Sequence, residues 1–373
     1  MSEHTRETTK ISDLPQKLID EILSRVTMIS LRRLRYDFKR LKDLLKDPIF
    51  IKKQIANARS TRKYHVLVVL KYRVYSMCSY INEIAMNDAP LFKRGIKLND
   101  PYHNNLEVDL SQAFHCEGIL LCTTKSNMFV VWNMFTGQSK WVEQQTQCQI
   151  DDVYALGYVY KELCHGYKIL KFRDSYHKEL EIYEFSSNSW RNLDAFSPEG
   201  YLKSRGVSLK GDVYWLFERI NQGNEYSLLS FDFWTETLQC LCVPFQWKEG
   251  RHDTIALSAV REEHLSLLYQ REATQKMEIW ITNEIETTSV SWKRFLTVDF
   301  KPHPHMFSRD MSFFIDEEKK IAVCCEKDQE DRIFNKVYIV GEDEYKVSRG
   351  FGFFDYRGYN SCPTMFGYVP RLV

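Results

Sequence analysis

The chain has 373 residues, of which 27% are charged and 44% are hydrophobic, and its formal net charge is +1. This length allows two domains or one large domain, and the composition is that of an ordinary globular protein rather than a disordered one. The first residues lack the apolar segment of a signal peptide, and no apolar run approaches the roughly 18 residues of a membrane span. The ten cysteines have no regular spacing. This fits free thiols in a reducing compartment, so we expect no membrane and a location in the nucleus and/or cytoplasm.

The charge is unevenly distributed. Residues 1–63 hold sixteen Lys or Arg against eight Asp or Glu, so the remainder of the chain is acidic. A basic segment favours an acidic partner, and nucleic acid is one candidate. However, these basic residues surround an apolar stripe and no nucleic-acid-binding motif accompanies them. We therefore expect a protein partner and no nucleic acid.

Residues 14–26 are predicted to form an amphipathic helix. Asp13 is a suitable cap, and Pro15 suits a first helical turn. Apolar residues recur every four positions, and two more widen the stripe. The stripe consists of Leu14, Leu18, Ile22 and Val26, widened by Ile19 and Leu23.

Two further helix starts follow. Ser30 can cap a second helix, and Asp47-Pro48 is a third start signal that leads into Ile49 and Phe50. The apolar positions of the second helix are Leu31, Leu34, Phe38 and Leu41. A unit of about 45 residues buries little surface alone. It therefore needs a partner, although a plain three-helix packing element without one is the alternative.

The order of short motifs in this segment resembles an F-box. The motifs are Leu14-Pro15, Ile22-Leu23-Ser24-Arg25, Ser30-Leu31-Arg32-Arg33 and Asp47-Pro48-Ile49-Phe50. The resemblance implies docking onto the SKP-type adaptor of a cullin-RING ubiquitin ligase. It implies adaptor contacts by Leu14, Pro15, Leu18, Ile22, Leu23, Leu31, Leu34, Phe38, Leu41, Pro48 and Phe50. Thr27, Phe38 and Leu41 depart from the family pattern, which leaves open an adaptor-independent scaffold or decoy.

From residue 64 onward the sequence predicts short strands in a repeat of about fifty residues. Each unit has an apolar strand after a turn, followed by a second strand that carries an aromatic residue. These aromatics are Trp132, Tyr183, Phe231, Trp280 and Tyr338, with separations of 51, 48, 49 and 58 residues. Such a period is typical of a β-propeller, because a single blade cannot cover its own apolar faces. It disfavours a β-sandwich array.

We expect about six blades, with seven as the nearest alternative. Five repeats span residues 109–350, and the strands at 65–75 are expected to join the aromatic C-terminal segment in a blade that closes the ring. The predicted fold class is mainly β with a small N-terminal α domain. The expected organisation is a flexible N-terminus (1–10), an F-box (11–55), a linker (56–63) and a β-propeller domain (64–373).

Several strand motifs are similar to the F-box-associated (kelch-like, FBA type 1) domain of plants. They are 115–122, Val131-Trp132-Asn133, Ser189-Trp190-Arg191, 208–211, Ser230-Phe231-Asp232-Phe233 and 279–283. The resemblance implies a non-enzymatic substrate receptor of an SCF-type ubiquitin ligase, whose propeller holds an unknown protein target. A propeller enzyme or lectin is the rival class, and it would require a catalytic or metal-binding cluster at the rim.

No motif in the sequence indicates catalysis, a cofactor or a metal site. Adjacent residues on a strand point to opposite faces, which argues against His115-Cys116 or Cys164-His165 as a nucleophile and base. The Cys pairs lack the second pair of a zinc site, and the His pair has no accompanying carboxylates. These pairs are Cys240 with Cys242, Cys324 with Cys325, and His303 with His305. Four tryptophans are expected in the blade core rather than in a binding floor, namely Trp132, Trp215, Trp280 and Trp292. The candidate recognition loops are 221–225 and 301–305.

Overall fold

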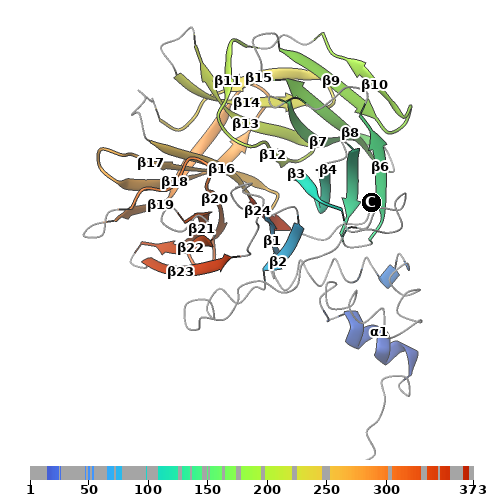
Figure 1. The fold of residues 1–373 in the computed structure, drawn as a ribbon, viewed down its shortest axis with the longest axis horizontal. Helices are drawn as coiled ribbons and strands as arrows, with labels where there is room; N and C mark the ends of the chain where they lie inside the picture. The colour runs from blue at the N-terminus through green and yellow to red at the C-terminus, as the bar shows by residue number, and fades with distance from the viewer. Residues whose placement is uncertain are drawn as a thin grey trace, which may run out of the picture.

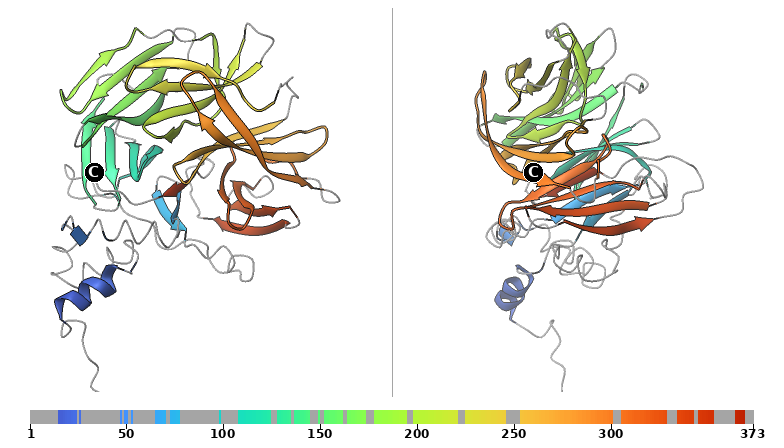
Figure 2. Two further views of the ribbon diagram at one scale, coloured as in Figure 1. Left: turned by 180° about the vertical axis from the view of Figure 1, so that it is seen from behind. Right: turned by 90° about the vertical axis from the view of Figure 1, so that its left-hand side faces the viewer.

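The computed structural model contains one described helix and 24 strands (Figure 1). The structure describes residues 15–24, 26, 47, 49–50, 53, 65–70, 73–77, 98, 108–124, 128–134, 137–144, 149, 152–161, 164–173, 178–194, 198–220, 225–245, 253–300, 305–328, 334–342, 345–352 and 364–368. The helix α1 (Gln16–Ser24) lies outside a ring of antiparallel sheets in each view (Figures 1 and 2).

Five sheets of four or five strands follow one another around the ring. Blade 1 contains β3 (Leu110–Cys116), β4 (Ile119–Thr124), β5 (Met128–Asn133) and β6 (Ser139–Glu143). Blade 2 contains β7 (Asp152–Lys161), β8 (Cys164–Arg173), β9 (Glu179–Glu184) and β10 (Ser189–Asn192). Blade 3 contains β11 (Gly200–Leu202), β12 (Val207–Leu209), β13 (Asp212–Arg219), β14 (Glu225–Asp232) and β15 (Thr237–Leu241). Blade 4 contains β16 (Thr254–Val260), β17 (His264–Gln270), β18 (Lys276–Ile285) and β19 (Val290–Asp299). Blade 5 contains β20 (Ser312–Asp316), β21 (Ile321–Lys327), β22 (Phe334–Gly341) and β23 (Tyr345–Gly352).

A sixth sheet joins the two ends of the propeller. It has the order β2-β1-β24, formed by β1 (His65–Leu70), β2 (Arg73–Met77) and β24 (Thr364–Tyr368). Strands β3, β7, β12, β16 and β20 contact one another in that order around the ring, and β24 contacts β20 and β16. The expected pairing of the 65–75 strands with the C-terminal segment is therefore confirmed. The count of about six blades is corrected to five, because the sixth sheet has only three strands among the described residues.

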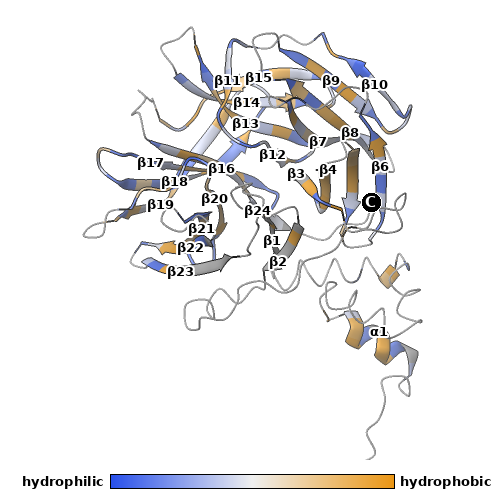
Figure 3. Ribbon diagram, viewed as in Figure 1, coloured by the Kyte–Doolittle hydropathy of each residue, from blue (hydrophilic) through white to orange (hydrophobic). Residues whose placement is uncertain are grey.

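The repeat read from the sequence corresponds to one pair of neighbouring strands in each blade, namely β4 with β5, β8 with β9, β13 with β14, β17 with β18 and β21 with β22. The first strand of each pair contains apolar residues that lie in the core, and all six residues of β4 are buried because neighbouring blades cover both of its faces. The periodic aromatics lie on the second strand of each pair, β5, β9, β14, β18 and β22. Figure 3 shows apolar residues along these strands in every blade. The fifty-residue period is therefore the blade itself.

Tryptophans on the outer strands join consecutive blades. The indole Nε1 of Trp190, on β10, donates a hydrogen bond to the carbonyl oxygen of Glu143 in blade 1, at 3.4 Å. Two periods later, the Nε1 of Trp292 on β19 donates to the carbonyl oxygen of Cys242, which follows β15 of blade 3, at 3.1 Å. Each bond supplements the packing of blade on blade.

Aromatic contacts fill the spaces between blades. Phe129 of blade 1 meets Tyr154 of blade 2 edge to face, with ring centroids 4.8 Å apart. Phe172 of blade 2 lies 6.3 Å from Trp215 of blade 3. Trp132 and Trp215 are buried, as expected for core residues. Trp280 and Trp292 are half-buried and pack against the apolar cluster between blades 3 and 4.

Candidate functional site

Among the described residues, large apolar side chains are exposed on the N-terminal helical segment, at blades 2 and 3, and on β23 of blade 5. In the helix, the carbonyl oxygen of Pro15 accepts hydrogen bonds from the backbone N–H groups of Leu18 (2.9 Å) and Ile19 (3.1 Å). Pro15 has no N–H of its own to leave unpaired at this position. At the other end, the Ser24 hydroxyl donates to the carbonyl oxygen of Glu21. The helix α1 therefore begins at Gln16, two residues after the predicted start at 14, and the predicted cap Asp13 lies outside the described residues.

The apolar stripe of α1 divides into an inner and an outer part. Ile19 and Leu23 are each 6% exposed, and Phe50 is 4% exposed. Leu18 and Ile22 lie one helical turn apart and are 52% and 44% exposed. Contact between apolar side chains and water is unfavourable. The two outer side chains therefore form a surface that a partner can cover.

A second helical segment carries another exposed apolar side chain. The carboxylate of Asp47 accepts a hydrogen bond from the N–H of Ile49 at 2.9 Å, which confirms Asp47 as a helix-start signal. Ile49 is 78% exposed. The Nζ of Lys53 lies 2.5 Å from a carboxylate oxygen of Glu21 and connects the segment to α1. We call Leu18, Ile22 and Ile49 the helical docking face.

The predicted adaptor-binding residues have different positions in the structure. Pro15, Leu18 and Ile22 are exposed, whereas Leu23 and Phe50 are buried and support the helices from within. Leu14, Leu31, Leu34, Phe38, Leu41 and Pro48 lie outside the described residues. Thr27 also lies outside them. Ile49 was absent from the predicted contacts, although its place beside the Asp47-Pro48 start signal could have indicated it.

The predicted recognition loops are mostly outside the described residues, since only Glu225 and His305 are described. The His305 ring stacks on Tyr338 at 4.6 Å, and its Nε2 lies 3.0 Å from the buried carboxylate of Glu326. His303, the other histidine of this pair, is not among the described residues. The described residues contain no group of three or more His, Cys, Asp or Glu that could hold a metal ion.

The other candidate chemical groups are packed into blades. The His115 Nε2 accepts a hydrogen bond from the N–H of Gly118 at 3.0 Å, and the Cys116 thiol accepts one from the Ser208 hydroxyl at 3.2 Å. The side chains of His115 and Cys116 therefore have different hydrogen-bond partners. Cys324 and Cys325 are buried free thiols, whereas Cys242 is an exposed one. The side chains of Cys164 and His165 lie outside the described set.

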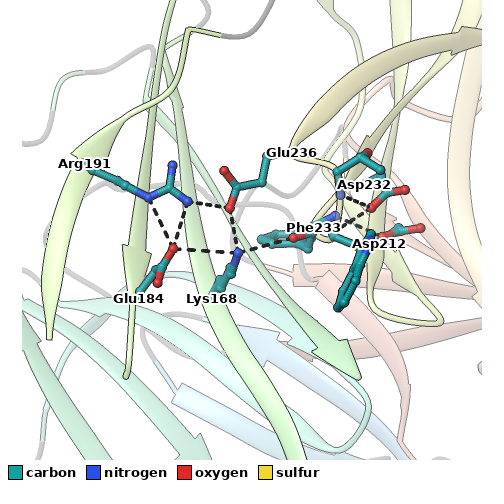
Figure 4. Close-up of polar contacts among 9 residues, drawn as sticks. Lys168, Glu184, Arg191, Asp212, Asp232, Phe233 and Glu236 are labelled. Carbon is teal, nitrogen blue, oxygen red and sulfur yellow. Dashed lines mark hydrogen bonds and ion pairs between the residues drawn. The ribbon is translucent and has the colours of Figure 1, made fainter. Parts of the chain in front are cut away.

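At the rim, a four-residue charge network joins blade 2 to blade 3 (Figure 4). Arg191 contacts a carboxylate oxygen of Glu184 at 2.8 Å and one of Glu236 at 2.5 Å. Lys168 contacts the same oxygen of Glu236 at 2.6 Å. The hydrogen bond from Arg191 lowers the pKa of Glu184 despite its partial burial. Burial alone would raise the pKa of Glu236, but hydrogen bonds from Arg191 and Lys168 lower it overall.

The network holds the turn between β14 and β15. Asp232 accepts hydrogen bonds from the N–H groups of Trp234 (2.7 Å) and Thr235 (3.0 Å), which is an Asx turn. The Phe233 side chain is completely buried. A Cβ on Gly157 of blade 2 would lie 2.1 Å from that ring, so only glycine permits this approach.

Asp212 lies beside this turn and accepts a hydrogen bond from the N–H of Phe233 at 3.2 Å (Figure 4). Burial, together with the nearby Asp232 carboxylate, raises the pKa of Asp212 to about 6. The hydrogen bond from Phe233 offsets part of this rise. The rim therefore holds a carboxyl group that titrates close to neutral pH.

The described helix is too short and polar to cross a membrane, so no membrane-spanning helix is found in this part of the chain. The F-box domain family matches residues 11–53. The family described as the F-box associated beta propeller domain matches residues 65–373. The chain is an F-box protein with an F-box-associated propeller. The resemblance drawn from the sequence motifs is thereby confirmed.

Relatives share both parts of this F-box protein. One from Arabidopsis thaliana, named as an F-box protein, is 51% identical over 420 residues and covers 100% of both chains. Another from the same plant, named as an F-box/kelch-repeat protein, is 40% identical over 389 residues and covers 99% of both. The similarity therefore extends across the helical segment and the propeller together.

Proposed function

We propose that this F-box protein is the target-recognition subunit of an SCF-type ubiquitin ligase. The helical docking face binds an SKP-type adaptor, which connects the chain to a cullin, and the propeller holds a protein target. The observation that carries the proposal is the outward position of Leu18, Ile22 and Ile49 within the segment that matches the F-box family. Burying such side chains against a partner contributes about 1.5–3 kcal/mol for each fully covered residue.

In this role the chain carries out no chemistry of its own. It raises the effective concentration of a target lysine near a ubiquitin-loaded enzyme held elsewhere in the complex. The closed ring suits this task, because contacts between blades, such as the hydrogen bond of Trp292 to the carbonyl oxygen of Cys242, hold neighbouring blades together. A location in the nucleus or cytoplasm is part of the proposal. It is supported by the described cysteines, which are free thiols.

The test is co-purification of the full chain with an SKP-type adaptor, beside a truncated chain that starts at Arg62. We expect the full chain to retain the adaptor and the truncated chain to lose it. Circular dichroism of the truncated chain serves as the control, since its propeller strands must remain folded. Absence of adaptor binding by the full chain would contradict the proposal and favour a propeller scaffold that acts outside the ligase.

A further inference from the structure

Trp234 is the most exposed tryptophan side chain recorded in the described part of the propeller, at 72%. It occupies the turn between β14 and β15, at the rim of blade 3. A large aromatic side chain in water on a folded surface is typical of a protein-interaction site.

The turn beneath Trp234 is held rigidly. The N–H of Glu236 donates to the carbonyl oxygen of Asp232 at 2.8 Å, and Glu236 has a positive φ of 57°. Lys168 and Arg191 of blade 2 bind the Glu236 carboxylate. An aromatic anchor on a fixed backbone loses little conformational entropy when a partner covers it.

The same turn in blade 2 shows that the backbone does not require a tryptophan. There, the N–H of Asn188 donates to the carbonyl oxygen of Glu184 at 2.8 Å, and Asn188 has a φ of 55°. The residue that corresponds to Trp234 in that turn is Ser186, which is also exposed. Since the two turns share their geometry, the indole has no role in forming the turn.

The charges next to Trp234 also differ between the two blades. Lys168 on β8 lies directly opposite Glu184 on β9, and their charged groups are 3.8 Å apart. In blade 3 the register pairs Val213 with Phe231, which places Asp212 directly opposite Asp232. Like charges in directly opposed positions destabilise a sheet. Blade 3 thus has Asp212 at the position where blade 2 has the cation Lys168.

A second exposed aromatic side chain lies on the neighbouring blade. Tyr160, at the end of β7, is 73% exposed, and its ring meets that of Tyr158 edge to face at 5.8 Å. The N–H of Tyr158 donates to the carbonyl oxygen of Gly211 at 3.1 Å, which places this end of β7 beside Asp212. We call Tyr160, Asp212, Asp232 and Trp234 the rim patch.

We propose that the rim patch is the target-docking surface and that it binds a basic segment of a protein target. An Arg or Lys side chain of the target packs on the Trp234 indole and is neutralised by the two aspartates. The occupant follows from charge complementarity, because the incoming cation takes the place that Lys168 fills in blade 2. This inference rests on the proposed function, since it names the class of target that the receptor holds.

The test is selection of short random-sequence displayed peptides on the full chain, followed by fluorescence anisotropy with the selected peptides. We expect enrichment of Arg or Lys in the selected peptides. Trp234→Ala is expected to weaken their binding by about tenfold or more, as truncation of an interface anchor does. Asp212→Lys places a lysine opposite the Asp232 carboxylate, as Lys168 lies opposite Glu184 in blade 2, and is expected to abolish binding. Ser186→Ala, at the matching turn, is the control and is expected to leave binding unchanged.

Thermal unfolding of each variant shows whether it is folded, and Asp212→Asn replaces Asp212→Lys if the latter fails to fold. Selection of no peptides, selection without basic enrichment, or unchanged binding by Trp234→Ala would each overturn the inference. Adaptor binding is measured on the same preparations. Loss of adaptor binding with retained peptide binding would contradict only the proposed function, whereas the reverse result would contradict only the rim patch.

Discussion

Asp212 and Asp232 lie directly opposite each other on β13 and β14, at the point where blade 3 reaches the rim. Each carboxylate is tied to the adjoining turn, Asp212 by the N–H of Phe233 and Asp232 by the N–H groups of Trp234 and Thr235. The pair therefore orders the turn while its like charges oppose each other. This balance makes stability at the rim dependent on pH.

Asp212→Asn is expected to stabilise the protein at pH 8 and to leave it unchanged at pH 4. The folded-state pKa of Asp212 is raised to about 6, above that of an unfolded aspartate near 3.9. Folding therefore favours the protonated form, and stability falls as the pH rises through 6. Allowing for partial exposure, the gain is about 1–2 kcal/mol. Urea unfolding of both proteins across this pH range measures it, and an equal difference at both pH values would contradict the assignment.

Gly157→Ala is expected to destabilise the propeller by about 1–3 kcal/mol, as overpacking does. The new Cβ would lie 2.1 Å from the Phe233 ring and 2.4 Å from the carbonyl oxygen of Gly211. Gly367→Ala is the matched control, because a Cβ there meets nothing within 4 Å. Thermal unfolding compares the two variants. Equal melting temperatures would show that blades 2 and 3 do not pack this closely.

Trp292→Phe is expected to cost about 1 kcal/mol, the usual net contribution of a hydrogen bond. It removes the 3.1 Å bond to the carbonyl oxygen of Cys242 and keeps most of the apolar contact. Trp190→Phe removes a longer bond of 3.4 Å to Glu143 and is expected to cost less. Chemical denaturation of the two variants measures the difference, and a larger loss in Trp190→Phe would refute this account of the inter-blade bonds.

Much of the fold could be predicted from the sequence because each blade repeats the same physical requirement. Strands such as β4 and β13 contain continuous apolar runs, and the aromatics from Trp132 to Tyr338 mark the strand that follows in each blade at nearly constant spacing. The pairing of β1 with β24 also followed from unpaired strands at the two ends. The blade count could not be predicted in this way, because only three described strands form the sixth sheet.

The sites were harder to predict because they depend on register and exposure. Leu18 and Leu23 belong to one apolar stripe in the sequence, but only the structure shows that the first is outward and the second is buried. Trp234 was not singled out among the tryptophans. Aligning the sequence of its turn with that of the blade 2 turn would have matched Trp234 with Ser186. This match would have indicated an unusual exposed residue. The apposition of Asp212 and Asp232 requires the strand register, which composition does not specify.

The central claim is that the helical docking face binds an SKP-type adaptor, and one double substitution tests it most directly. Leu18→Asp with Ile22→Asp places two charges on exposed positions of α1, which a partner would have to bury at high cost. Tyr201→Asp with Ile220→Asp is the matched control, since these propeller side chains are 45% and 46% exposed. Co-purification with the adaptor is predicted to fail for the helix variant and to succeed for the control. Retention of the adaptor by the folded helix variant would contradict the account.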